Sequence, residues 1–277
     1  MAVGIGAGIV EKARDLGAVA AGIAGVDLLK RSPSHQMLAK FGTKIDGEYS
    51  YGEEYDLNAV DWPAGARSAV VLAVSHPRDE PELDWSCASG QTPGNRLLVQ
   101  VAQQLSDWLE ESLDIRARPM PYHVENGGVY VKDAAVLAGL GSIGRNNIVI
   151  SPDHGPRIRF RALLLDAELT PTGPITFDPC RDCDEPCRTA CPQQAFAKAV
   201  LSSVEAGIDA LPGRDGSFSR SRCGLQLDKD MEHSGVGDYD SFGDDIDSPS
   251  PVLEPAAQAE GSVKWCRRCE LACPVGK

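Results

Sequence analysis

The chain has 277 residues, with 27 Lys and Arg against 40 Asp and Glu, and its formal net charge is −13. This balance argues against a nucleic-acid partner, because such binding rests largely on phosphate neutralisation by Lys and Arg. No run approaches the ~18 apolar residues of a membrane span, and no secretory leader is visible at the start, so we expect a cytoplasmic protein without a membrane partner.

The first part of the chain mixes helical and strand patterns. Apolar residues recur at the spacing of a helix face over residues 5–16, 92–113 and 131–139. Apolar runs typical of strands cover residues 17–26, 68–77, 115–124, 146–151 and 157–166, with a long loop from the first of them to about residue 66. Thr92 can cap the longest helix, and Pro93 suits its first position. The mixture predicts an α/β or α+β fold.

The composition changes near residue 167, where a linker rich in Pro, Thr and Gly begins, and everything after it is organised by cysteine. We therefore expect two domains, residues 1–170 and 171–277. Within the second domain, residues 228–251 are acidic, rich in Gly and Ser, and without periodicity, which predicts a flexible loop.

Four cysteines crowd into residues 178–192, DPCRDCDEPCRTACP, at the spacing C-x2-C-x3-C-x3-C followed by Pro. This run is typical of iron–sulfur proteins in which the fourth Cys ligates a second cluster. A second run, WCRRCELACPVGK at 265–277, repeats C-x2-C-x3-C-P, and Cys223 can supply the remaining ligand. Eight thiolates suffice for two [4Fe-4S] clusters, and two structural zinc sites are the alternative.

The spacing also predicts which thiols share a cluster. Cys191 begins a helical pattern over 192–207, so it should point away from the preceding loop toward the second cluster, and Pro192 suits the first helical turn. By symmetry, Cys273 should return to the first cluster. We expect the first cluster on Cys180, Cys183, Cys187 and Cys273, and the second on Cys191, Cys223, Cys266 and Cys269. A lone cysteine is more often inert than reactive, so we interpret Cys87 as a bystander.

Residues 139–144, GLGSIG, match G-x-G-x-x-G, but a helical pattern precedes them and a strand follows. A dinucleotide site needs the opposite order, so we exclude one here. Because glycine permits close approach of the backbone, two interpretations stay open. Either a bulky cofactor lies over this turn, or the turn is a plain tight connection.

The stretch from Tyr122 to Leu169, with AGLGSIGRNN at its centre, resembles epoxyqueuosine reductase and its short relatives, and so do the two cysteine runs and Cys223 in SRCGLQL. That family is similar to the reductive dehalogenases. The resemblance implies an α+β fold, in which a nitroreductase-like domain holding base-off cobalamin is followed by a bacterial-type ferredoxin domain with two [4Fe-4S] clusters.

The resemblance also implies site residues. Cofactor contacts are expected at Gly139, Gly141, Gly144, Arg145, Asn147 and Val149. Glu125 stands fourteen residues before Gly139, where the family has its catalytic aspartate, and is therefore the candidate catalytic acid. Lys132 resembles the basic residue usual at its position, and Tyr122 and His123 are candidate proton donors or substrate contacts. Arg157, Arg159 and Arg161 share one face of a strand, where they could bind an anion or stand solvated beside acids.

These features predict a cobalamin-dependent iron–sulfur reductase that acts on a small molecule or a modified nucleoside. An external low-potential donor such as ferredoxin or flavodoxin would supply electrons. Full-length members of the family continue into a helical-repeat domain that helps to hold tRNA, so tRNA is a doubtful partner for this acidic chain. The alternative is an electron-transfer protein that reduces the corrinoid of a partner methyltransferase. A further alternative is that FMN, instead of cobalamin, occupies the first domain.

Overall fold

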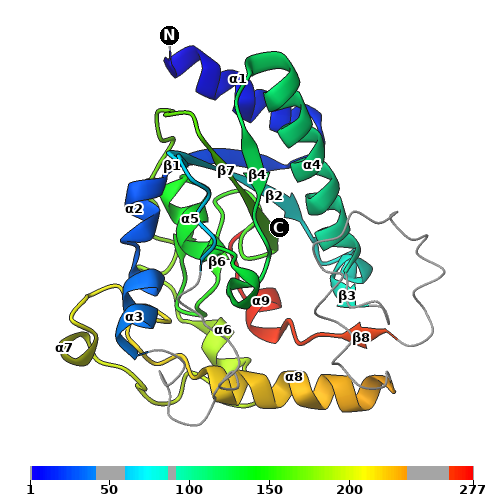
Figure 1. The fold of residues 1–277 in the computed structure, drawn as a ribbon. Coiled ribbons are helices and arrows are strands. Elements are labelled where there is room, and N and C mark those ends of the chain that lie inside the picture. Colours follow the sequence, from blue (N-terminus) through cyan, green and yellow to red (C-terminus); the bar gives the residue numbers. More distant parts are fainter. Residues whose placement is uncertain (1, 42–59, 87–91, 236–261, 277) are drawn as a thin grey trace.

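The computed structural model describes residues 2–41, 60–86, 92–235 and 262–276. Its centre is a four-stranded antiparallel sheet in the order β1-β2-β7-β4 (Figure 1). These strands are β1 (Ala20–Gly25), β2 (Ser68–Ser75), β7 (Ile158–Leu165) and β4 (Ala117–Pro119). Strand β2 is buried along nearly its whole length, because neighbours pair with both of its edges and apolar cores lie on both of its faces.

Helices cover both faces of this sheet. Successive side chains of β2 point to opposite faces, so Val70 and Leu72 pack into one apolar core while Val71 and Ala73 pack into another. Helices α1 (Ala2–Asp15) and α4 (Pro93–Leu113) close the first core, and α2 (Val26–Lys30) and α5 (Val131–Leu137) close the second. The result is a mixed α/β fold of three layers.

The remaining elements are short, apart from α8. They are α3 (Pro33–Phe41), the 3₁₀ helices η1 (Pro81–Asp84) and η2 (Val124–Asn126), β3 (Trp85–Ser86), β5 (Ser142–Ile143), β6 (Val149–Ile150), α6 (Pro186–Thr189), α7 (Ser203–Ala206), α8 (Arg220–Ser234), β8 (Val263–Lys264) and α9 (Arg268–Leu271). No helix in the part of the chain described by the structure is long and apolar enough to cross a bilayer.

The strong patterns of the first part are confirmed. Helix α4 begins where expected, and the Thr92 hydroxyl accepts a hydrogen bond from the Asn95 amide at 3.1 Å. The expected long loop instead contains α2 and α3, and residues 42–59 of that loop lie outside the described residues. Strand β6 pairs with β5 in a separate hairpin rather than joining the main sheet.

The helix expected over 192–207 is wrong. The helix near Cys191 is α6, which precedes this residue in the chain. Most of residues 192–202 form turns and bends. Gln194 has a left-handed backbone with φ 52°, which a helix cannot contain. The apolar side chain of Phe196 packs against Phe218 and under the Arg188 guanidinium instead of lining a helix face. Only Ser203–Ala206 is helical, and a capping box at Ser202 starts it.

The acidic loop expected over 228–251 also needs correction. Residues 228–234 are the end of α8, whose first turn is capped by the Ser219 hydroxyl and which ends before Gly235 at φ 68°. The helix shows little apolar periodicity because it is polar on most of its surface, so composition alone resembled a loop. Residues 236–251 lie outside the described part of the chain.

A second small sheet ties the cysteine-rich region to the first part of the chain. Strand β3 pairs antiparallel with β8, with Trp85 opposite Lys264 and Ser86 opposite Val263. The Trp265 indole donates to the Ser86 hydroxyl at 2.6 Å. Residues 179 positions apart therefore lie side by side, and Cys266 follows directly after this pairing.

Candidate functional site

The structure gathers the eight thiols into two sets of four. Cys187 lies near enough to Cys180, Cys183 and Cys273 for their charges to interact, and these four are called the first group. Cys269 interacts in the same way with Cys191, Cys223 and Cys266, and these four are called the second group. All eight are free of disulfides. The membership is the one that the spacing predicts, whereas cluster binding by each group stays a prediction.

The sulfurs of each group stand too far apart for one zinc ion. Four thiolates at about 2.3 Å from a zinc lie roughly 3.8 Å from one another in a tetrahedron. Among the described residues, no three cysteine sulfurs lie within 4.8 Å of one another. The donor set therefore fits a larger polynuclear group, such as [4Fe-4S], better than it fits zinc.

Burial and mutual proximity raise the pKa values of these thiols. Burial raises the pKa of Cys187 to about 11 and that of Cys269 to about 12, and the neighbouring thiols of each group add to the effect. Thiolates are the form that binds metal, so binding must displace these protons. Positive charge within each group is what would hold four thiolates together.

Short helices and turns place the ligands. Cys187 lies in α6, Cys223 in the first turn of α8, and Cys269 in α9. The Cys273 amide donates to the Glu270 carbonyl at 3.1 Å, so Cys273 closes the turn that follows α9. This short helix and the turn after it therefore supply one thiol to each group, with Glu270 between the two cysteines.

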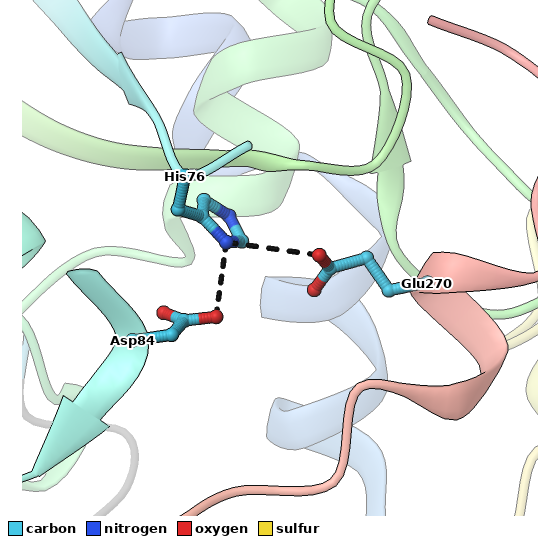
Figure 2. A group of neighbouring side chains, drawn as sticks. All are labelled: His76, Asp84 and Glu270. Carbon is cyan, nitrogen blue, oxygen red and sulfur yellow. Dashed lines mark ion pairs between the residues drawn. The ribbon is translucent and has the colours of Figure 1, made fainter. Parts of the chain in front are cut away.

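A buried network of charges docks α9 on the first part of the chain. His76 follows β2, Asp84 ends η1, and Glu270 lies in α9, and Figure 2 shows their three side chains pointing toward one another. The His76 Nδ1 atom is 2.9 Å from Asp84 Oδ2 and 3.7 Å from Glu270 Oε1. Arg267 pairs with both acids, at 3.2 Å to Asp84 Oδ2 and 2.5 Å to Glu270 Oε1, and Arg159 pairs with Asp84.

This network resembles a metal site in its donor atoms but not in its charge. His76, Asp84 and Glu270 bring three ligand atoms within 4.8 Å of one another. Arg159 and Arg267 already balance the two carboxylates, so a divalent cation would add uncompensated charge to a buried site. We therefore interpret the network as an ion-pair seam. The sequence analysis did not predict this network. Its only sign in the sequence is Glu270, which stands between Cys269 and Cys273.

The arginine row of β7 serves the same docking. Arg157 donates to the Val275 carbonyl at 2.8 Å, and Arg159 pairs with Asp84. Arg161 donates to the Met120 carbonyl at 3.2 Å and to Asn95 Oδ1 at 3.1 Å. None of the three forms the solvated edge that was one of the expectations. Their shared face holds the C-terminal cysteine run and the loop after β4.

The glycine-rich turn is explained by packing within the chain. A Cβ at Gly141 would lie 2.3 Å from the Ile150 carbonyl oxygen, and one at Gly139, where φ is +77°, would lie 3.0 Å from the Thr172 oxygen. At Gly144 a Cβ would meet the Ile150 side chain at 2.4 Å. The second of the two open interpretations, a tight connection, therefore accounts for the glycines. Gly141→Val would disturb the fold itself and cannot test cofactor binding.

Arg145 and Asn147 join the two parts of the chain. Arg145 pairs with Glu185 at 3.0 Å, and its carbonyl accepts from Arg188 at 3.1 Å. Asn147 Oδ1 accepts from the Gly213 amide at 3.1 Å. Val149 is buried in the second core. Cofactor contacts at these residues and at the three glycines stay a prediction.

Lys132 lies beside the second group. Its side chain, at the start of α5, donates from Nζ to the Asn147 carbonyl at 3.0 Å. Desolvation by the surrounding protein lowers its pKa, and Arg220 and Cys223 lie within electrostatic range of it. Burial raises the pKa of Tyr122, which also lies near Arg220. Residues of α5, of the loop before η2 and of the start of α8 therefore lie close to the second group.

Two candidates from the sequence, Glu125 and Cys87, lie wholly or in part outside the described structure. Glu125 lies in η2, between His123 and Gly127, but its side chain is outside the described part of the structure. Its role as catalytic acid stays a prediction. Cys87 lies outside the described residues altogether. His123 stacks edge-on against Tyr122, with ring centroids 5.1 Å apart.

The fold and the thiols together define an α/β protein with a paired four-cysteine module, a construction typical of redox proteins. A tetrachloroethene reductive dehalogenase of Desulfitobacterium hafniense is 30% identical over 169 residues, which cover 58% of this chain and 29% of that protein. An epoxyqueuosine reductase of Gloeobacter violaceus is 28% identical over 201 residues, which cover 70% of this chain and 61% of that protein. No protein-family model matches the chain.

The structure of epoxyqueuosine reductase from Streptococcus thermophilus has the same fold. The TM-score is 0.59 over 99% of this chain and 66% of that chain, at 19% sequence identity. The chain is thus related to the epoxyqueuosine reductases and, with them, to the reductive dehalogenases, and the resemblance seen in the sequence is confirmed. It spans less than two thirds of either curated relative.

We expect double variants to report which thiols share a group. After anaerobic reconstitution, iron and sulfide should each approach about eight per chain if each group holds a four-iron cluster. Cys187→Ser/Cys273→Ser should lose no more iron than either single variant, because both residues serve the first group. Cys187→Ser/Cys269→Ser should lose about twice as much. Equal loss by the two double variants, or zinc in place of iron, would contradict the assignment.

We also expect His76 to make stability depend on pH. Burial, opposed in part by Glu270, lowers the His76 pKa from 6.5 to about 4. The unfolded chain therefore binds a proton that the folded chain does not, so this contribution is complete above pH 6.5 and is lost toward pH 4. Between pH 7 and pH 5, the free energy of unfolding measured in urea should fall by about 2 kcal/mol more in the wild type than in His76→Gln. His233→Gln, at an exposed residue of α8, is the control and should behave as the wild type does.

Proposed function

We propose that the chain is a cobalamin-dependent iron–sulfur reductase, with the first and second groups each holding a [4Fe-4S] cluster. One observation carries the proposal: two sets of four thiols, in which no three described sulfurs lie within 4.8 Å of one another, as the ligands of one zinc ion would. The names of the relatives support a reductase rather than a carrier without a substrate.

The residues fit the clusters in number, type and spacing. Cys180, Cys183, Cys187 and Cys273 would hold one cluster, and Cys191, Cys223, Cys266 and Cys269 the other. Cys223 of the second group lies within electrostatic range of Lys132 and Arg220. Cys183 of the first group lines an open hollow of about 1050 Å³, together with Asp182 and Pro274. An external low-potential donor would therefore approach the first group, and the second group would face the cofactor.

For cobalamin, the glycines do not supply a cradle, because atoms of the chain itself fill the space beside Gly139, Gly141 and Gly144. The cobalamin part of the proposal therefore rests on the relationship to the reductive dehalogenases. Bound cobalamin would supply low-potential reducing chemistry at cobalt, which is the kind of reaction that cofactors carry. The chain's own residues would orient the substrate and control protons. Lys132 holds the turn at Asn147 through a hydrogen bond of 3.0 Å from Nζ to the carbonyl.

The names of the relatives indicate two broad classes of substrate. One relative is named for tetrachloroethene, a halogenated small molecule, and another for epoxyqueuosine, a modified nucleoside. We propose a substrate of one of these kinds. The net charge of −13 disfavours tRNA, because a phosphate backbone would be repelled.

We expect visible spectroscopy to separate the cofactor hypotheses. Anaerobically purified protein mixed with cobalamin should develop the bands of a base-off corrinoid on top of those of the clusters. FMN should produce no shifted flavin spectrum in the same assay. Flavin bands that shift on binding would favour FMN, and cluster bands without either cofactor would favour the electron carrier.

Glu125→Gln is expected to slow turnover about 10²–10⁴-fold, the usual worth of general acid catalysis. A free Glu has a pKa near ~4.3, so a Glu that donates protons near neutral pH must be kept protonated by its surroundings. The variant keeps the shape of the side chain and removes the proton. Iron content and corrinoid binding should match the wild type. Unchanged turnover would contradict the role of Glu125. The same holds if the protein only transfers electrons to a partner and the variant transfers them at an unchanged rate.

A further inference from the structure

The hollow of about 1050 Å³ lies directly against the first group of thiols. Cys183 lines this hollow and is partly exposed, whereas Cys180, Cys187 and Cys273 are buried. Cys183 is therefore the most accessible of the four. The hollow is the place where a partner that arrives from solvent comes closest to the first group.

The apolar part of the lining is held in place by the chain. Phe177 lines the hollow and packs on the buried cluster of Ile150, Cys180 and Cys273. Its carbonyl accepts a hydrogen bond from the Ser142 hydroxyl at 2.6 Å. Three prolines add to this lining, Pro179, Pro186 and Pro274. Because proline rings fix the backbone φ, the surface is ordered in advance and loses little freedom when a partner binds.

The charged part of the lining is mainly acidic, with three aspartates against one arginine. Asp178 is matched by Arg214 at 2.6 Å, and Arg181 lies 3.9 Å from the same carboxylate. Asp182 and Asp184 are exposed, and within the described ranges of the chain neither forms an ion pair with a cation. These two carboxylates stand on either side of Cys183 in the sequence, so negative charge borders the accessible thiol.

Shape and charge together fit another protein better than a small substrate. Small-molecule sites bury most of their ligand, whereas this hollow is open to solvent. An apolar centre with a polar rim is the usual anatomy of a protein–protein interface. The acidic rim selects the sign of the partner's charge, because opposite charges speed the encounter and like charges oppose it.

We propose that this hollow is the docking surface for a protein electron donor whose contact face is basic. The proposal rests on the proposed function, because it takes the first group to hold a cluster. Lysines or arginines of the donor would meet Asp182 and Asp184, and an apolar part of its surface would face Phe177. One electron would pass from the donor's redox centre, which is oxidised, to the first cluster, which is reduced. The expectation of a ferredoxin or flavodoxin is thereby narrowed to a carrier with a basic contact face.

Electron exchange with a redox protein of adjustable charge tests the proposal. The reconstituted protein is reduced, and its clusters are then oxidised by cytochrome c, in which lysines surround the haem edge, or by succinylated cytochrome c, in which carboxylates replace these cations. One electron leaves a cluster for each ferric haem that is reduced, and stopped-flow absorbance gives the rate. The probe accepts electrons instead of donating them, but it must approach the same cluster.

Two variants change the charge of the rim, and one serves as the control. Asp182→Asn/Asp184→Asn removes both charges, and Asp182→Lys/Asp184→Lys reverses them. Glu11→Gln/Asp15→Asn removes two exposed acids from α1 and so changes the net charge by the same amount. Helix α1 lies at one end of the molecule and α6 toward the other (Figure 1).

At low ionic strength, the wild type should react faster with cytochrome c than with the succinylated form. Salt should reduce this difference, because it screens exposed charges. Removal of both aspartates should lower the ratio of the two rates about tenfold, at the lower end of the usual effect of electrostatic steering. Charge reversal should lower the ratio further. The control should keep the wild-type ratio, and the iron content should be the same in every variant.

An unchanged ratio in the aspartate variants, or an equal change in the control, would overturn the proposal. Equal slowing of both probes would overturn it as well, because the aspartates would then support the cluster instead of docking a partner. If neither probe reacts while dithionite still reduces the clusters, the hollow admits a small reductant and not a protein.

Failure of the proposed function can be told apart from failure of the docking surface. If the purified chain binds no iron, the proposed function fails. The charge of the hollow is then measured by the rates at which cationic and anionic methanethiosulfonates modify Cys183, followed by mass spectrometry. A preference for the cation that is lost in Asp182→Asn/Asp184→Asn would support a surface for a basic partner, and equal rates would contradict it.

Discussion

The docking of α9 on the first part of the chain is the interaction on which the candidate site depends. This four-residue helix carries Cys269 of the second group and is followed by Cys273 of the first, so its position sets both groups at once. Its anchor is the buried arrangement of two arginines, two carboxylates and a histidine. Ion pairs of this kind contribute little net stability, but removing one partner leaves a buried charge and is costly. The network therefore acts mainly by fixing where α9 can lie.

The same seam explains why the three-layer domain and the cysteine region form one unit. Arg157, directly before β7 of the main sheet, donates to the Val275 carbonyl in the C-terminal cysteine run. The pairing of β3 with β8 places Cys266 next to the first part of the chain. On the other side, Arg145 and Asn147 hold the glycine-rich turn to the loop around Gly213.

Local patterns could be predicted from the sequence, and long-range charge pairing could not. The continuous apolar run of β2 and the capped start of α4 each depend on neighbours in sequence. The membership of the thiol groups followed from spacing because the motif constrains it. By contrast, Arg267 and His76 meet across 191 positions, and nothing near either residue indicates the other. The helix expected over 192–207 failed because Phe196 found its apolar partner in Phe218, a tertiary contact that the helical period could not reveal.

The glycines of residues 139–144 show a related limit. A sequence shows that a side chain is absent, but not what fills the space, and here the chain's own carbonyls fill it.

The crossing of ligands between the two groups has a consequence for how the protein matures. Neither group can be completed by one continuous segment, since the first needs Cys273 and the second needs both Cys191 and the run that begins at Cys266. During synthesis, the loop of Cys180, Cys183 and Cys187 would emerge from the ribosome without its fourth thiol, and the group would stay incomplete until α9 had been made and docked. If the groups bind metal, loading of both would therefore depend on the docking of α9. A chain interrupted before Cys266 would leave five thiols of the two groups without the partners that complete them.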